Sequence, residues 1–223
     1  MTRKLSFSLV FVAATLAAGC GASAERAPAG PSTTASRSPA FLRDEEQLAR
    51  DVYRHLQARY DQPPFAHIAG CEQRHLEAMG VLAAAQGVPV AAGPEVAGRF
   101  ADPELQALYD RLVARGDTSL DAALAVGALI EETDIADLQR ALAAAPSPDA
   151  QATYQRLLNA SHNHLRAFHR NLSARNVSYT PEVLARADYD AIIAGASGCG
   201  QGGGPGRGHG GGRPCDGRCA AGR

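Results

Sequence analysis

Helical periodicity runs through residues 41–193 and limits the fold more than any other feature of this chain. Apolar residues recur there at steps of three and four, and no strand-like alternation competes with them. Prolines, glycines and capping residues divide the pattern into segments. Long helices are expected at 41–60, 65–86, 119–145 and 147–175, and shorter helical segments at 103–115 and 180–193. The predicted fold class is therefore all-α.

The lengths of the connections indicate how the four long helices are arranged. Short turns near Gln62 and Pro146 join the first helix to the second and the third to the fourth. The second and third helices are joined by a long crossover, which carries the short helix opened by the Asp102 cap and Pro103. Two hairpins linked by one long crossover are the ferritin-like arrangement of a four-helix bundle. We predict that arrangement.

Residues 1–19 are typical of a signal peptide of the lipoprotein type. Two basic residues precede an apolar run that is too short to span a bilayer stably. The run ends in Leu16-Ala17-Ala18-Gly19-Cys20, which resembles the lipobox of bacterial lipoproteins, whose cysteine becomes the lipidated N-terminus. We expect an exported lipoprotein, anchored to the membrane through Cys20 and facing the periplasm or cell exterior. Soluble secretion after cleavage near Ala24 is the alternative.

Two segments without periodicity flank the helical domain. Residues 20–40 are rich in Ala, Ser, Pro and Gly and predict a flexible tether, whereas residues 194–223 form a Gly-rich tail that is expected to be disordered. The tail carries Cys199, Cys215 and Cys219, whose role the sequence leaves open. The helical domain, residues 41–193, must therefore hold together mainly by packing.

The charge of the chain is unevenly distributed. Residues 41–193 carry 14 Lys and Arg against 21 Asp and Glu. An acidic domain offers no basic face to nucleic acid, so nucleic acid is excluded as a partner, and cations suit the domain better.

Each long helix has an ionisable residue inside its apolar stripe. The residues in question are Glu46, Glu72, His75, Glu131 and His164. Within each hairpin, the distances of the Glu and the His from the turn differ by three residues, ~4.5 Å at about 1.5 Å per residue. A lone buried carboxylate is costly, and carboxylates and imidazoles that share a core compensate each other best around a cation. The five residues therefore predict a shared metal site.

Some of these residues also have ordinary interpretations. Glu46 could belong to an acidic first turn that complements the helix dipole. The choice of Glu131 over Glu132 depends on how the stripe is drawn, and His164 could be a hydrogen-bonded core histidine. Their joint occurrence at matching heights favours the metal site.

The pattern resembles the ferritin-like superfamily of di-iron carboxylate proteins. In that family one helix of each hairpin brings a Glu and the other brings Glu-x-x-His. Glu72-Gln73-Arg74-His75 matches that element, and Glu131 matches the Glu of the third helix. Glu46 with Tyr53 resembles the first-helix pair of ferritins and rubrerythrins, in which the Tyr lies beside the metals.

The fourth helix departs from the family. Ser161 stands three residues before His164, where the family has a Glu. Glu132, Asp134 or a water molecule are the candidate replacements for the absent carboxylate. Without a replacement, the site would hold one ion, or two ions with open positions.

An uncharacterised bacterial family of ferritin-like domains of unknown function is more similar still. The similarity is carried by the stretches 44–53 (DEEQLARDVY), 130–135 (IEETDI) and 161–168 (SHNHLRAF), and it covers about 41–193. It implies the fold and the metal site but no reaction.

The resemblance and the donor types imply a pair of iron or manganese ions, with zinc as an alternative. Such a centre can bind O2 or peroxide, and Tyr53 is the candidate catalytic residue, as a donor of a proton or an electron. Asp51, Asp134 and Arg166 are candidate residues for orienting the ligands.

The function we favour is that of an exported di-iron or di-manganese oxidoreductase acting on O2, peroxide or metal ions. The alternatives are a non-enzymatic lipoprotein that binds or stores metal, and a helical interaction module without metal. Whether the chain forms a homodimer is left open.

Overall fold

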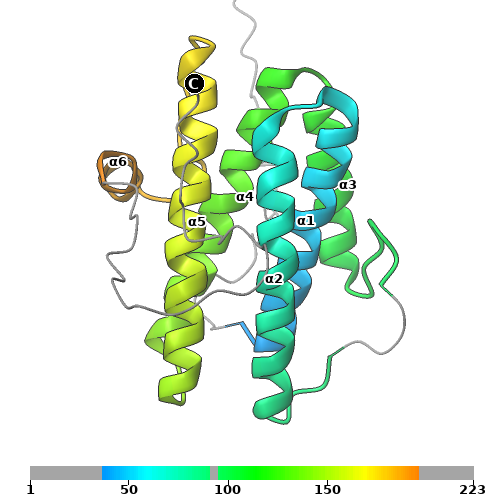
Figure 1. The fold of residues 1–223 in the computed structure, drawn as a ribbon, viewed down its shortest axis with the longest axis vertical. Coiled ribbons are helices and arrows are strands. Elements are labelled where there is room, and N and C mark those ends of the chain that lie inside the picture. The colour runs from blue at the N-terminus through cyan, green and yellow to red at the C-terminus, as the bar shows by residue number, and fades with distance from the viewer. Residues whose placement is uncertain (1–36, 91–94, 196–223) are drawn as a thin grey trace, which may run out of the picture. The chain divides into compact units, whose positions relative to one another are not determined.

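The computed structural model describes residues 37–90 and 95–195, and these form six helices and no strands (Figure 1). The helices are α1 (Pro39–Tyr60), α2 (Pro63–Ala85), α3 (Pro103–Gly116), α4 (Leu120–Ala143), α5 (Pro148–Ala174) and α6 (Arg186–Ala194). The all-α prediction is confirmed for this part of the chain. The predicted signal peptide, the lipidation site at Cys20, most of the tether and the tail cysteines lie outside the described residues.

Short polar side chains define where most of the helices begin. A side-chain oxygen accepts a hydrogen bond from the first helical turn at Ser38, Asp102, Ser119 and Ser147. The second helix begins differently from the prediction, because Pro63 and Pro64 form its first turn instead of preceding it. The first-turn N–H groups of a helix have no partner within it, so proline fits there without losing a hydrogen bond.

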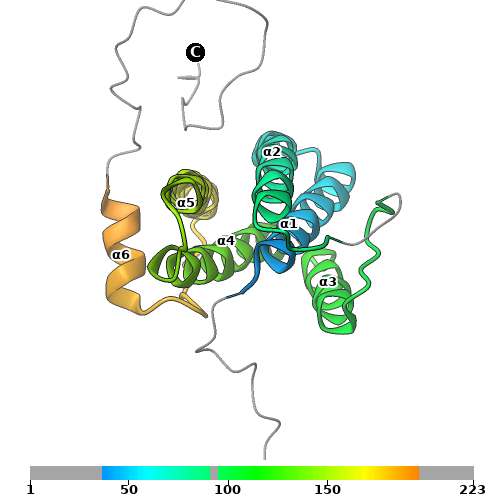
Figure 2. The same cartoon turned by 90° about the horizontal axis from the view of Figure 1, so that it is seen from below.

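The long helices are paired as two hairpins. The α1 helix packs along α2, and α4 packs along α5; further contacts between α2 and α5 and between α1 and α4 join the hairpins. The crossover helix α3 packs against α1 and α4. Figure 2 shows α3 outside α1 on one side of the domain and α6 outside α5 on the opposite side. None of the described helices is long and apolar enough to cross a membrane.

The last helix begins later than predicted. Residues 180–185 do not form a helix, and α6 starts at Arg186. The backbone N–H groups of Glu182, Val183 and Leu184 donate hydrogen bonds to the buried carboxylate of Glu132. These hydrogen bonds give the backbone donors of this segment partners without a helix.

Aromatic side chains from α1, α2 and α5 pack together and fix the spacing between the two hairpins. The ring centroids of Tyr53 and Phe168 are 5.4 Å apart, and those of Phe65 and Phe168 are 5.8 Å apart. Gly127 makes this packing possible, because a Cβ atom there would lie 2.3 Å from the Phe168 ring. The glycine therefore lets α5 approach α4 closely beside Tyr53.

Candidate metal centre

The structure brings together the five residues that the helical stripes single out. Glu46 comes from α1, Glu72 and His75 from α2, Glu131 from α4 and His164 from α5. All five are buried, with exposed fractions between 1% and 5%. The protein thus concentrates carboxylates and imidazoles in its interior, where unpaired charges are costly.

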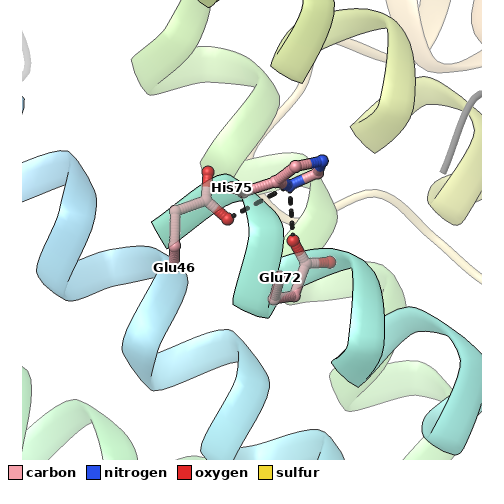
Figure 3. A group of neighbouring side chains, drawn as sticks. All are labelled: Glu46, Glu72 and His75. Atoms are coloured by element: carbon pink, nitrogen blue, oxygen red, sulfur yellow. Dashed lines mark ion pairs between the residues drawn. The ribbon is translucent and has the colours of Figure 1, made fainter. Parts of the chain in front are cut away.

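One half of the group joins α1 to α2. His75 Nδ1 lies 2.7 Å from Glu72 Oε2 and 3.4 Å from Glu46 Oε2 (Figure 3). Figure 3 shows both carboxylates pointing toward the same side of the imidazole ring. One ligand atom from each of these residues lies within 4.8 Å of the others, so one cation could contact all three.

The other half joins α2 to α4 and α5. His164 Nδ1 lies 3.0 Å from Glu72 Oε1 and 3.4 Å from Glu131 Oε2. The two imidazole rings are stacked, with centroids 5.7 Å apart. Glu72 therefore belongs to both halves, with one carboxylate oxygen near each histidine.

The contacts between the histidines and the carboxylates are ion pairs, and their geometry leaves several atoms of the group without a hydrogen bond. Buried atoms without a hydrogen-bond partner include Nδ1 of His75, both ring nitrogens of His164, Oε1 of Glu46 and Oε1 of Glu72. Buried polar atoms of native proteins nearly always have a partner, and an ion is one explanation when several lack one together. Donor atoms that converge in this way could hold a cation between them.

Burial and mutual charge shift the pKa values of the group. Burial raises the pKa of Glu46 to about 8, in spite of the nearby His75. Burial alone would lower the pKa of His164, but the charges on Glu72 and Glu131 outweigh it and raise that pKa to about 9. The two imidazoles in turn hold the pKa of Glu72 well below its usual range, against the effect of burial. With pKa values raised in this way, Glu46 and His164 hold protons near neutral pH.

Tyr53 adjoins the group through Glu131. Its hydroxyl donates a hydrogen bond of 2.6 Å to Glu131 Oε1. Burial and the charge on Glu131 raise the pKa of Tyr53 well above its usual value, so the phenol keeps its proton. The side chain is placed to position this carboxylate.

Asp134 and Ser161 also lie beside the group. The Ser161 hydroxyl donates a hydrogen bond to Asp134 Oδ2. Burial, together with the charges on Glu46, Glu131 and Glu72, raises the pKa of Asp134 well above its usual value. A carboxylate from α4 thus occupies the neighbourhood of the serine that replaces the expected Glu on α5.

Glu132 does not join the group. Its carboxylate accepts a hydrogen bond of 2.6 Å from the Tyr179 hydroxyl and the three backbone hydrogen bonds from residues 182–184. The Glu132 carboxylate is thus hydrogen-bonded outside the group, and of the two neighbouring glutamates it is Glu131 that faces His164.

Asp51 and Arg166 hold peripheral segments of the chain in place. Asp51 accepts hydrogen bonds of 2.9 Å from Gly98 N and from Arg50 Nε, which fixes the crossover against α1. Arg166 donates a hydrogen bond of 3.0 Å to the backbone oxygen of Ile192, which holds α6 against α5. The partners that tie these residues to other segments, Gly98 and Ile192, lie far along the chain and could not be predicted from the sequence.

Sequence reasoning missed two features of the site. Glu45 has a buried carboxylate oxygen without a partner, and burial and Asp137 raise its pKa well above the usual value. A cavity of about 100 Å³ also reaches the carboxylates and includes side chains of α3 in its wall. Neither feature had a signal in the helical periodicity.

Cys71, which precedes Glu72, supplies no thiolate to the group. It is fully buried and disulfide-bonded. The donor set of the described residues is therefore made of carboxylate oxygens and imidazole nitrogens.

Fold and site together define an all-helical protein with a buried carboxylate and histidine group shared by its four long helices. Residues 37–196 match the family described as an uncharacterized protein domain, DUF2202, and the chain belongs to that family. Uncharacterized protein MJ0754 of Methanocaldococcus jannaschii is 37% identical over 156 residues, which cover 70% of this chain and 84% of that protein.

A solved structure is similar as well. The crystal structure of hypothetical protein MJ0754 from Methanococcus jannaschii DSM 2661 matches with a TM-score of 0.69 and 36% sequence identity. The match covers 71% of this chain and 91% of that chain. Neither name assigns an activity.

Proposed function

We propose that the domain is a ferritin-like four-helix bundle that binds two ions of iron or manganese between its long helices. The observation that carries the proposal is the position of Glu72, whose two oxygens face two different histidines in a group of buried atoms without hydrogen-bond partners. One carboxylate between two sets of donors suits a bridging ligand.

The donors divide into two sets. Glu46, Glu72 and His75 would hold one ion, and Glu131, Glu72 and His164 would hold the other. Carboxylate and imidazole donors suit iron and manganese, and zinc is the alternative, whereas copper(I) prefers sulfur ligands that this group lacks.

Asp134 is our proposed replacement for the carboxylate that α5 lacks. Two divalent ions would leave one net positive charge if only Glu46, Glu72 and Glu131 were bound to them. Asp134 would make the charge zero, and its hydrogen bond from Ser161 orients it beside the group. A neutral metal group is easier to bury than a charged one.

The proposed activity is an oxidoreductase reaction of O2, peroxide or metal ions. The bound ions would supply the electron-transfer chemistry. Among the chain's own residues, Tyr53 keeps its proton, positions Glu131 and can donate that proton close to the ions. The surrounding helices exclude water from the group.

Metal analysis of the purified protein tests the proposal. We expect close to two ions per chain, and loss of both in Glu72→Gln. The matched control is Glu77→Gln, an exposed carboxylate on the same helix, which should leave the metal content unchanged. Absence of bound metal after incubation with Fe(II) or Mn(II) would refute the proposal and favour the interaction module. Bound metal without turnover of O2 or peroxide would identify a storage or binding protein.

We further propose export with a lipid anchor at Cys20. The proposal rests on the apolar leader and the small residues before this cysteine. Labelling of the wild-type protein with a radioactive fatty acid, lost in Cys20→Ser, would support the anchor. Release of unlabelled protein to the medium would favour soluble secretion.

A further inference from the structure

The cavity beside the carboxylate group lies where the crossover helix meets the bundle. It measures about 100 Å³. Aliphatic side chains from α1, α3 and α4 form most of its wall: Leu48, Ala49, Leu108, Leu112, Leu129 and Ile130. The α3 helix packs against both α1 and α4 and supplies Leu108 and Leu112 to the wall.

Polar residues line the cavity beside the aliphatic ones. Glu46, Glu72, Glu131 and Asp134 all contribute to its lining, as do Glu45 and Thr133, whereas neither histidine of the group does. A molecule in the cavity would therefore contact the carboxylate side of the group. The aliphatic part offers no hydrogen-bond partners to it.

These surroundings decide what kind of molecule the cavity can hold. Water is retained in a buried cavity only where it has two to four polar partners, and an apolar cavity of about 150 Å³ lined by Leu, Ile and Phe stays dry and binds benzene or xenon. A cavity of about 100 Å³ with aliphatic walls is suited to a somewhat smaller non-polar molecule. An anion would lose its solvation there and face the carboxylates of the lining, so it would not be compensated.

We infer that this cavity is a binding site for a small non-polar molecule, held against the carboxylates of the group. Binding itself needs no metal, but reaction of the molecule there rests on the proposed function. Two sources share this chemistry, namely a dissolved gas such as dioxygen and a hydrocarbon of a few carbon atoms.

Xenon is the probe for the site. Metal-free crystals of the protein pressurised with xenon should show a xenon atom among Leu112, Ile130 and Ala49. Leu108→Phe, and independently Ala49→Leu, should fill the space and abolish the xenon peak. Leu112→Ala should enlarge the space and retain it, and the control Leu172→Ala, a buried leucine of α5 away from the cavity, should leave the peak unchanged. Absence of xenon from the wild-type cavity, or ordered water in its place, would overturn the inference.

Nuclear magnetic resonance distinguishes the two sources. Dissolved dioxygen should broaden the methyl signals of Leu112 and Ile130, and the broadening should be lost in Leu108→Phe. If propane or cyclopentane also shifts those signals, the site takes hydrocarbons, and if only dioxygen acts on them, it takes the gas. No response to any of these molecules would overturn the inference. All of these measurements use metal-free protein. A negative result would therefore overturn the cavity inference without bearing on whether the protein binds metal.

Discussion

The hydroxyl of Ser161 on α5 donates a hydrogen bond to the carboxylate of Asp134 on α4. The α4 helix thereby presents two carboxylates three residues apart, Glu131 and Asp134, to the buried group. The α5 helix presents only His164. The carboxylate that the Glu-x-x-His pattern would place on α5 is therefore available from the helix opposite.

Replacing Asp134 tests whether it binds metal. We expect Asp134→Asn to weaken binding of one of the two ions by about 10- to 100-fold, the usual effect of losing a ligand or its close support. Ser161→Ala removes only the hydrogen bond and should have a smaller effect. The double variant Asp134→Asn/Ser161→Glu should restore affinity, because it returns a carboxylate to the same place. Titration calorimetry measures all three, and wild-type affinity in Asp134→Asn would contradict the assignment.

Glu72 should matter more than any other member of the group. Glu72→Gln removes the anion shared by His75 and His164, so the metal-free protein should lose about 3–5 kcal/mol of unfolding free energy, as when a buried ion pair is broken. Glu46→Gln should leave one ion bound, because the other set of donors is intact. Urea unfolding and metal analysis measure the two effects. Equal metal content in the two variants would argue against a shared ligand.

The metal-free protein should become less stable as the pH rises from 6.5 to 9. The pKa values of Glu46 and His164 are about 8 and 9 in the folded protein. In the unfolded chain these groups have their ordinary pKa values of 4.5 and 6.5. Between those values the folded protein holds more protons than the unfolded chain, so the unfolding free energy falls with pH. The contribution of His164 is complete below pH 6.5 and is lost as the pH rises through 9.

Metal should remove this dependence above pH 6.5. Bound ions replace the protons on both residues, and the folded and unfolded states then hold the same number there. Urea unfolding between pH 6.5 and 9, with and without metal, measures the difference. Parallel curves in the two conditions would show that metal does not displace these protons.

Tyr53 should affect the reaction more than metal binding. Tyr53→Phe keeps the aromatic packing with Phe168 and removes the hydrogen bond to Glu131. We expect two ions to remain bound while oxidation of Fe(II) by O2 slows by about 100-fold, the scale of a lost proton donor. Tyr60→Phe is the control. It removes a hydroxyl from the same helix, but that hydroxyl donates its hydrogen bond to Gly116 O and not to Glu131. Stopped-flow absorbance follows the reaction, and unchanged kinetics in Tyr53→Phe would exclude the role.

Glu132 should support the fold without affecting metal. Tyr179→Phe removes the hydrogen bond to its carboxylate and should lower the unfolding free energy by about 1.5–3 kcal/mol. Metal content should not change, because none of the donors near Glu132 belongs to the buried group. Thermal unfolding and metal analysis check the two parts. Loss of metal from Tyr179→Phe would mean that the two regions are coupled.

Local chemistry in the sequence was sufficient to predict that six helical segments form in the described part of the chain, but not where the second and the last of them begin. Serine and aspartate caps, prolines in first turns and the spacing of apolar residues act within a few positions of the chain. The five donors could be predicted as well, because an α-helix rises by a constant distance per residue and the two turns are short. Counting residues from each turn therefore gives the heights of Glu46, His75, Glu131 and His164 within their hairpins.

Only the tertiary structure determines which residues contact these donors. Glu131 and Glu132 differ by one position, and the rotation of α4 about its axis, fixed in part by Phe168 against Gly127, turns one toward the histidines and the other toward the segment before α6. The partners of Asp51 and Arg166 and the aliphatic wall supplied by α3 depend on where distant segments pack. Packing of that kind is a property of the whole domain, and no short stretch of sequence contains it.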